Sequence, residues 1–175
     1  MSYSSAEEAI LQLQKGDKEA LEVIYNVYKA PLYQFVFRYT NNEQLSIDLV
    51  QDTFEKLQHK FHQFDPEKGK LKTYLYQIAY NTMMTRLRRQ NVFRTLLPIL
   101  AERHPHHENS DEKLTVQAAI QSLSEDLRAI VLLTYYHDLT QKEISTILHI
   151  PVGTVKSKLH RALKKLREEL EVNED

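Results

Sequence analysis

Two stretches of the chain concentrate basic side chains without an acidic one among them. Residues 70–94 and residues 154–167 each carry six Lys or Arg, although the 175-residue chain has a formal net charge of only -1. Lys and Arg attract phosphates, so two basic blocks in a near-neutral chain predict two separate contacts with a polyanion. A single basic run is as often a solvated helix face. Two runs on otherwise amphipathic helices favour the polyanion.

The second block follows a pattern typical of a helix-turn-helix. Thr140 and Glu143 have the spacing of a capping box and predict a short helix over 141–148. A turn at His149 and Ile150 follows, and Pro151 suits the first turn of the next helix. His149 stands where such turns often place Gly to reach a positive φ. The second helix of this motif enters the DNA major groove.

The basic helix offers side chains for two kinds of DNA contact. Candidates for base edges are Thr154, Lys156, Ser157, His160 and Arg161. Candidates for phosphates are Lys158, Lys164, Lys165 and Arg167. The alternative is a basic amphipathic helix that only packs on a protein partner, which the capped helix before it makes less favourable.

The first basic block interleaves its cations with tyrosines. Tyr74, Tyr76 and Tyr80 lie among the Lys and Arg residues of the predicted helix 71–90. Basic side chains hold phosphates, and aromatic faces stack on unpaired bases at about 1–3 kcal/mol each. This combination predicts that the helix holds a single strand as a duplex opens. The alternative is that the tyrosines belong to the core.

A third set of polar residues shares one face of the predicted helix 43–61. The helical spacing i, i+3 and i+4 groups Asp48, Gln51, Asp52 and Glu55. Taken alone, this group is also compatible with an ordinary solvated helix face.

Apolar residues recur at helical spacing almost throughout, which predicts an all-α fold of two helical domains. Residues 1–94 form the first domain, residues 95–113 a flexible linker and residues 114–175 the helix-turn-helix domain. In the first domain we expect helices over 5–15, 18–39, 43–61 and 71–90, with a turn at Asn41 and Asn42 between the second and the third. The second of these is expected to be interrupted or shifted near Pro31, and a loop covers 64–70. In the second domain we expect helices over 114–123 and 126–137 before the motif. A short helix around 96–103 is possible within the linker.

Several classes of protein are excluded. The chain has no cysteine, which fits a reducing compartment and rules out disulfides and thiolate metal sites. Neither a signal peptide nor an apolar run of about 20 residues is apparent, so we expect a soluble cytoplasmic protein. His59 with His62, or the tract His104, His106 and His107, falls short of a zinc site, so no metal or cofactor is expected. No nucleophile stands beside a base, so no catalytic residue and no enzyme are predicted.

The order of four motifs resembles the extracytoplasmic function (ECF) group, or group 4, of bacterial sigma-70 factors. The matching segments are DLVQDTF (48–54), FDPEKGKLKTYL (64–75), YQIAYNTMMTRLRR (76–89) and the stretch from Glu143 to Ala162. The sequence departs from the family pattern at several positions. Leu71 replaces a usual Phe, Tyr74 a Trp, Tyr80 an Arg, Thr85 an Asp and Lys158 an Arg, so the exact -10 sequence stays open.

The resemblance implies a role for each surface. The face of Asp48, Gln51, Asp52 and Glu55 would bind the β′ clamp of core RNA polymerase. The -10 element would be recognised and melted by Phe64, Lys70, Lys72, Tyr74, Tyr80, Asn81, Arg86, Arg88 and Arg89. The -35 element would be bound by Thr154, Lys156, Ser157, Lys158, His160, Arg161, Lys164 and Lys165.

The resemblance also implies partners. The second domain would meet the β flap, the linker would run toward the RNA exit path, and a monomer would be held inactive by an anti-sigma factor. Two alternatives remain: a non-sigma helix-turn-helix regulator with a helical sensor domain, and a protein-binding helical adaptor. How the two domains sit in the free protein is open, and the acidic stretch 102–112 is one candidate to shield a basic face.

Overall fold

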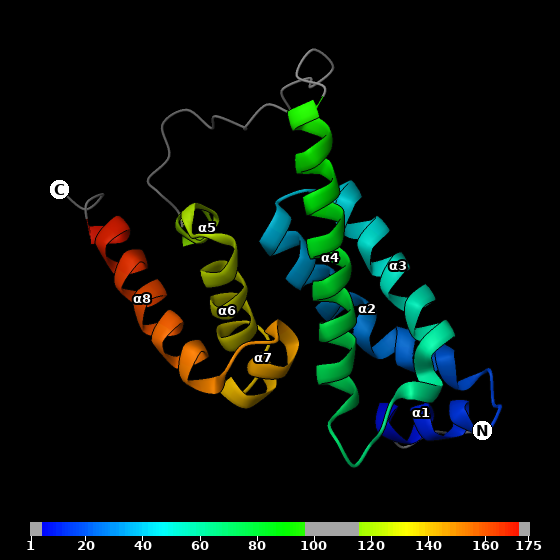
Figure 1. Ribbon diagram of the computed structural model, residues 1–175. Coiled ribbons are helices and arrows are strands. Elements are labelled where there is room, and N and C mark those ends of the chain that lie inside the picture. The colour runs from blue at the N-terminus through cyan, green and yellow to red at the C-terminus, as the bar shows by residue number, and fades with distance from the viewer. Residues whose placement is uncertain (1–4, 97–115, 172–175) are drawn as a thin grey trace.

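The computed structural model describes residues 5–96 and 116–171, and within these ranges every regular element is a helix. The all-α prediction is therefore confirmed. Figure 1 shows two groups of helices with the long α4 between them. The first group contains α1 (Ala6–Gln14), α2 (Ala20–Thr40), α3 (Glu43–Lys60), the 3-10 turn η1 (Phe61–Gln63) and α4 (Leu71–Leu96). The second group contains α5 (Val116–Ser122), α6 (Glu125–Tyr135), α7 (Gln141–Leu148) and α8 (Val152–Glu171).

Local capping sets the ends of the first helices. The side chain of Ser5 accepts a hydrogen bond from the backbone N–H of Glu8 at 3.1 Å and begins α1. Asn41 ends α2 in the left-handed conformation at φ 51°, which Asn adopts more readily than most residues. Asn42 then caps α3 by accepting from the N–H of Leu45 at 2.9 Å. The turn predicted at the two asparagines is thus confirmed.

Two expectations about helix lengths were wrong. Helix α2 continues through Pro31, because Tyr28, Leu32 and Phe35 on either side of the proline are packed in the core. That packing outweighs the hydrogen bond and the steric fit that a proline removes. Helix α4 extends to Leu96 instead of ending near Gln90, since no Gly or Pro interrupts residues 91–96.

The loop 64–70 is anchored by α1, the first helix of the chain. The amide of Gln14 on α1 donates to the carbonyl oxygens of Phe61 at 2.9 Å and Phe64 at 2.8 Å. The ring of Phe64, 7% exposed, packs on Tyr74 with centroids 5.4 Å apart. These contacts fix the loop against the start of α4.

The two groups pack directly on one another. Helix α4 lies against α7, and α2 lies against α6. Between them, Tyr76 is completely buried and His137 is only 5% exposed. The predicted linker 95–113 falls outside the described residues apart from its first two, which belong to α4. The suggested helix 96–103 and the acidic stretch 102–112 likewise lie outside them, save Leu96, and the domain boundaries stay a prediction.

Candidate nucleic-acid interfaces

The helix-turn-helix has the local geometry that its sequence predicts. The backbone N–H of Thr140 donates to Oε2 of Glu143 at 2.8 Å, and the N–H of Glu143 donates back to Oγ1 of Thr140 at 3.2 Å. His149 takes the left-handed conformation at φ 56°, in the position where Gly is common. The hydroxyl of Ser145 donates to the carbonyl of Ile150 at 2.6 Å and ties the turn to α7. The angle between α7 and α8 is therefore fixed by bonds local to the motif.

Helix α8 turns its apolar face inward and most of its polar residues outward. Val155 and Ala162 are fully buried against α6 and α7. Thr154 is partly buried at the start of the helix. The exposed polar residues between Lys156 and Arg167 are Lys156, Ser157, His160, Arg161, Lys164, Lys165 and Arg167, and the exposed Glu168 and Glu171 follow at the end of the helix. Five exposed cations on one helix give a surface suited to the phosphates and bases of a duplex.

Lys158 is placed differently from the other basic residues of α8. Its ammonium group donates to the carboxylate of Asp126 on α6, and its side chain is only 23% exposed. Burial alone would raise the pKa of Asp126, but hydrogen bonds from Lys158 and Ser124 outweigh it and lower the pKa to about 2. Lys158 thus joins α8 to α6, and its predicted phosphate contact would require this ion pair to break.

Helix α4 divides into two halves with different surroundings. Toward its C-terminal end, Arg86, Arg88, Arg89 and Arg94 are exposed. Toward its N-terminal end, the polar side chains meet the second helical group. Lys72 donates to the carbonyl of His137, and Asn81, itself exposed, lies 3.4 Å from Nε2 of His149. The predicted -10 residues therefore do not form one open surface in this arrangement.

The aromatic residues near the loop are mostly structural. Tyr76 belongs to the core, as the alternative interpretation expected, and Tyr74 and Tyr80 are half-buried. The hydroxyl of Tyr74 donates to the carbonyl of Lys60 at 3.2 Å. Burial raises the pKa of both Tyr74 and Tyr80, so their hydroxyls stay protonated. Phe64, also predicted as a DNA contact, is buried, because its ring packs against the ring of Tyr74. Its side chain stabilises the loop and is not exposed to DNA in this arrangement.

A cavity of about 380 Å³ lies where the loop, α4 and α7 meet. The loop contributes Asp65, Lys68 and Lys70, and α7 contributes Lys142 and Glu143. Sequence reasoning missed the α7 side, because residues 142–146 come together with the loop only through the packing of the two helical groups. No local pattern of residue types signals that contact.

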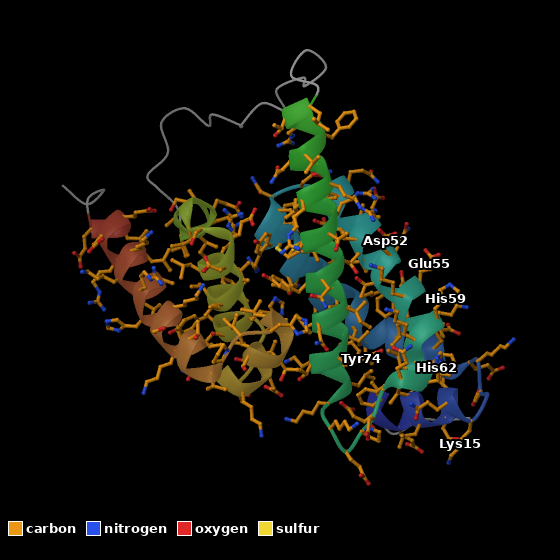
Figure 2. The ribbon with its side chains drawn as sticks, in the orientation of Figure 1. Lys15, Asp52, Glu55, His59, His62 and Tyr74 are labelled. Carbon is orange, nitrogen blue, oxygen red and sulfur yellow. The ribbon has the colours of Figure 1, made fainter. Side chains whose placement is uncertain are left out.

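The predicted polymerase-binding residues line the outer side of α3. Gln51 and Glu55 are exposed, while Asp48 and Asp52 are half-buried. Figure 2 shows Asp52 and Glu55 on the side of the molecule away from α8. Behind them, Leu49, Val50 and Phe54 are buried, so a well-packed helix presents the carboxylates. The structure brings these four residues together as their spacing predicted.

Neither a metal site nor a membrane span is found among the residues that the structure describes. No group of three or more His, Asp or Glu side chains is arranged to hold a metal ion in residues 5–96 and 116–171. His59 and His62 lie at the end of α3 and in η1, whereas His104, His106 and His107 are outside the described residues. Among the helices that are described, none has both the length and the hydropathy of a membrane span.

Comparison with known families gives matches over both helical groups. The family described as Sigma-70 region 2 matches residues 24–92, and the family described as Sigma-70, region 4 matches residues 113–166. Among similar proteins is the ECF RNA polymerase sigma factor SigW of Bacillus subtilis, which is 31% identical over 92% of this chain and 94% of its own length. The ECF RNA polymerase sigma-E factor of Haemophilus influenzae is 26% identical over 98% of both chains.

Solved structures share the fold. The sigma factor RpoE of Bartonella quintana, in complex with the anti-sigma factor NepR, matches with a TM-score of 0.71. It is 24% identical, and the match covers 85% of this chain and 95% of that one. CnrH, in complex with the cytosolic domain of CnrY, matches with a TM-score of 0.74 at 23% identity, over 97% and 99% of the two chains.

Proposed function

The chain belongs to the ECF group of the sigma-70 family, and on that premise we propose how its surfaces divide the work of promoter recognition. It is an RNA polymerase sigma factor that directs promoter-specific transcription. In our proposal α3 binds core polymerase, α8 binds the -35 element, and the loop 64–70 with α4 binds and opens the -10 element. The protein supplies binding energy and has no catalytic step of its own. Because it is proposed to act with RNA polymerase, we propose a cytoplasmic location.

The outer face of α3 is proposed to bind the β′ clamp of the polymerase. Its support is the cluster of three carboxylates and Gln51 on a helix whose other side is packed in the core. A rigid helix loses little conformational entropy on binding, and the carboxylates suit a basic partner surface. The β flap is proposed to contact the second helical group.

The exposed face of α8 is proposed to lie in the major groove at the -35 element. Lys156, Ser157, His160 and Arg161 would meet base edges with Thr154, while Lys164 and Lys165 would meet phosphates. The capping box and the bonded turn at His149 support this proposal, because they fix the angle at which α8 leaves α7, as a groove-reading helix requires.

The loop 64–70 and α4 are proposed to hold the strand that opens at the -10 element. The exposed arginines of α4 would follow the backbone, and Asn81 would read a base. Because Tyr74 and Tyr80 are half-buried, only the exposed part of each ring is available to contact a base. The cavity beside the loop is large enough for the ring system of a base that leaves the stack.

The observation that carries this function is the placement of the acidic face of α3 and the basic face of α8 on opposite helical groups. One chain can therefore bind polymerase and duplex DNA at the same time. Two weak contacts joined in one complex behave as a single strong one, because the second contact becomes intramolecular.

An anti-sigma factor is proposed as a further partner. The two solved structures of similar fold each hold a second protein, named as the anti-sigma factor NepR in one and the cytosolic domain of CnrY in the other. The shared fold supports a binding surface of the same general kind on this chain, which we propose acts as a monomer.

Transcription in vitro tests the function directly. Purified core polymerase is mixed with the protein and fragments of the genome that encodes it, and the 5′ ends of the transcripts are sequenced. We expect new start sites that share two upstream elements and that are absent with core polymerase alone. A protein that binds duplex DNA but never starts transcription with core polymerase would instead be a helix-turn-helix regulator of another kind.

A further inference from the structure

One lysine of α8 is paired with a carboxylate on another helix. Nζ of Lys158 donates to Oδ2 of Asp126 on α6, and the side chain of Lys158 is only 23% exposed. Three other lysines in ion pairs, Lys68, Lys70 and Lys164, keep 84%, 74% and 72% of their side chains exposed. Pairs as exposed as these are screened by solvent and contribute little, so their lysines stay available to a further partner. Lys158 is held more firmly.

The carboxylate of Asp126 is fixed in place by two further donors. Its Oδ1 accepts a hydrogen bond from the hydroxyl of Ser124 at 2.7 Å and another from the backbone N–H of Leu127 at 2.9 Å. Asp126 also lies in the first turn of α6, where the helix dipole favours a negative charge. These contacts leave Oδ2 directed at Lys158. The folded pKa of Asp126, about 2, keeps the carboxylate charged around neutral pH.

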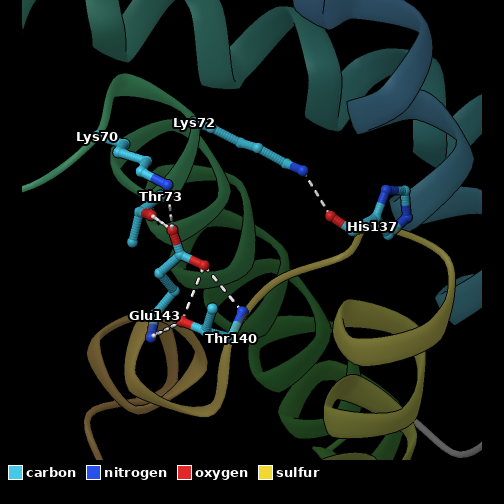
Figure 3. A network of polar contacts seen from close by, with 6 residues as sticks. All are labelled: Lys70, Lys72, Thr73, His137, Thr140 and Glu143. Atoms are coloured by element: carbon cyan, nitrogen blue, oxygen red, sulfur yellow. Dashed lines mark hydrogen bonds and ion pairs between the residues drawn. The ribbon is translucent and has the colours of Figure 1, made fainter.

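The pair of Lys70 with Glu143 is a contrasting case (Figure 3). Nζ of Lys70 lies 3.7 Å from Oε1 of Glu143, the oxygen that also accepts from the hydroxyl of Thr73. The other oxygen, Oε2, accepts from the backbone N–H and the hydroxyl of Thr140. Glu143 is therefore held largely by partners other than its lysine. Asp126 is different, because one of its two oxygens is left for Lys158.

Lys158 stands at the edge of the surface that is proposed to meet duplex DNA. Thr154 precedes it by four positions and Arg161 follows it by three, so helical spacing places Lys158 beside two residues proposed to contact base edges. A lysine carries its charge on a flexible four-carbon stem. Without its partner, Lys158 would be able to turn toward the phosphates that flank those bases.

We propose that Asp126 limits the affinity of this protein for duplex DNA, by holding Lys158 in an ion pair and withholding its charge from the phosphates. The inference rests on the proposed binding of α8 to duplex and adds a residue, on a different helix, that sets its strength. Phosphate contacts carry no sequence information, so the withheld cation lowers the affinity for every sequence alike. A genome presents about 10⁶–10⁹ non-specific sites, so weaker binding leaves more of the protein free to meet polymerase.

Removal of one charge tests the proposal. Asp126→Asn keeps the size of the side chain and releases Lys158 from its ion pair. The full-length protein is titrated against a fluorescent, random-sequence duplex, and anisotropy is followed at salt concentrations from about 50 to 200 mM. We expect Asp126→Asn to bind at least about threefold more tightly at the lowest salt. The slope of log K against log salt should steepen by about 0.9, because one more phosphate contact releases counterions.

Glu125→Gln is the matched control. It removes the same charge from the neighbouring position in the first turn of α6, and Glu125 is exposed. Its salt slope should equal that of the unaltered protein. Asp126→Glu retains the charge and should keep the unaltered slope as well. An equal steepening in Glu125→Gln would mean that the loss of any nearby negative charge has the same effect, which overturns the proposal.

The background Lys158→Gln separates release of the lysine from simple loss of charge. Asp126→Asn has no lysine to release in this background, so the double variant should have the slope of Lys158→Gln alone. The same steepening with and without Lys158 would overturn the proposal. Weaker binding by Asp126→Asn in the native background would also overturn it, because the pair would then position α8 for DNA instead of withholding a cation.

Urea unfolding shows whether each variant is folded under the conditions of the titration. If Asp126→Asn is not folded, Asp126→Ser replaces it, since a serine hydroxyl also accepts hydrogen bonds from the first turn of a helix. The same increase in affinity and in slope is expected of it. An unchanged affinity in the folded variant would show that Lys158 is not withheld from DNA by Asp126.

Lys164→Ala distinguishes failure of this inference from failure of the proposed function. Lys164 is exposed on α8 and is proposed to meet a phosphate, so its loss should weaken binding and flatten the slope by about 0.9. If that occurs while Asp126→Asn does not strengthen binding, Asp126 has no such role and the function stands. If neither substitution alters duplex binding and no transcription starts with core polymerase, both are wrong.

Discussion

The lysines of α8 show how residues of one type on one helix differ in what they do. Lys156 is exposed, whereas Lys158, two residues later, is held by Asp126. Each residue of an α-helix is rotated by about 100° from the one before it, so positions 156 and 158 face different sides of α8. The two lysines therefore meet different surroundings. The sequence places both lysines in the basic block, but only one of them is free to meet DNA without breaking an ion pair.

Substituting each lysine by Ala separates these roles. Lys156→Ala should weaken binding to the cognate duplex by about 1–3 kcal/mol, because a proposed base-edge contact is lost. Lys158→Ala should change duplex affinity little and lower the free energy of unfolding by about 1 kcal/mol, since Asp126 is partly exposed and screened by solvent. Fluorescence anisotropy and urea unfolding measure the two effects. The reverse pattern would mean that Lys158 leaves Asp126 when DNA binds.

His137 makes stability depend on pH. Burial, followed by the nearby charges of Lys72 and Arg38, lowers the pKa of His137 to about 4 in the folded protein. An unfolded chain, with an ordinary histidine pKa of about 6.5, binds the proton more readily. Folding therefore weakens as the pH falls from about 6.5 toward 4, and the stability is complete above that window.

Between pH 7 and pH 5 this difference corresponds to a loss of up to about 2 kcal/mol in the free energy of unfolding. His137→Gln should be less stable at pH 7 but should lose much less between the two pH values. Urea unfolding of both proteins at each pH measures the change. Asp126 does not contribute in this window, because both its ordinary pKa of 3.8 and its folded pKa of about 2 lie below pH 5. Parallel losses in both proteins would assign the pH dependence to other groups.

Among the helices, α3 has the most self-contained role. Its four polar residues come from one helix and keep their arrangement whatever the second helical group does. Helix α4 is different, because its surroundings change along its length. Its arginines near the C-terminal end are exposed, while its N-terminal half is bonded to α7.

Reversal of one charge on α3 tests its role. Asp52→Arg should weaken binding to core polymerase by at least about tenfold, because it places a cation where an anionic face is proposed to meet the clamp. Its affinity for duplex DNA should not fall, since α8 is on the other helical group. Glu19→Arg, an equal charge change at an exposed position outside the face, is the control. Loss of both activities, or of neither, would contradict the assignment; competition for core polymerase measures it.

The bond between α1 and the loop 64–70 gives another element-level prediction. Gln14→Ala removes both hydrogen bonds to the carbonyls of Phe61 and Phe64. We expect the free energy of unfolding to fall by about 1–2 kcal/mol, and amide hydrogen exchange in the loop to accelerate. Gln12→Ala on the same helix is the control. Unchanged exchange in the loop would show that its other contacts are sufficient to hold it.

At the scale of the whole molecule, the relation between the two helical groups determines which surfaces are available. The closed arrangement leaves the face of α3 open and covers half of α4.

Much of the fold could be predicted because its signals are local. The capping box of Thr140 and Glu143, the turn at Asn41 and Asn42, and the left-handed His149 depend on residues a few positions apart. The same holds for the shared face of Asp48 to Glu55. Four ordered motifs also indicated the family. The roles of individual DNA-binding residues stay predictions.

Only the tertiary structure decided what happens across long separations in the chain. Phe64 is buried, and α2 continues through Pro31. Lys158 pairs with Asp126 on α6, and α7 packs against α4. Lys72 and His137 are 65 positions apart, and nothing in either neighbourhood encodes their bond. Helical periodicity reports which side of a helix is apolar, whereas the choice of partner for that side depends on how all the helices pack together.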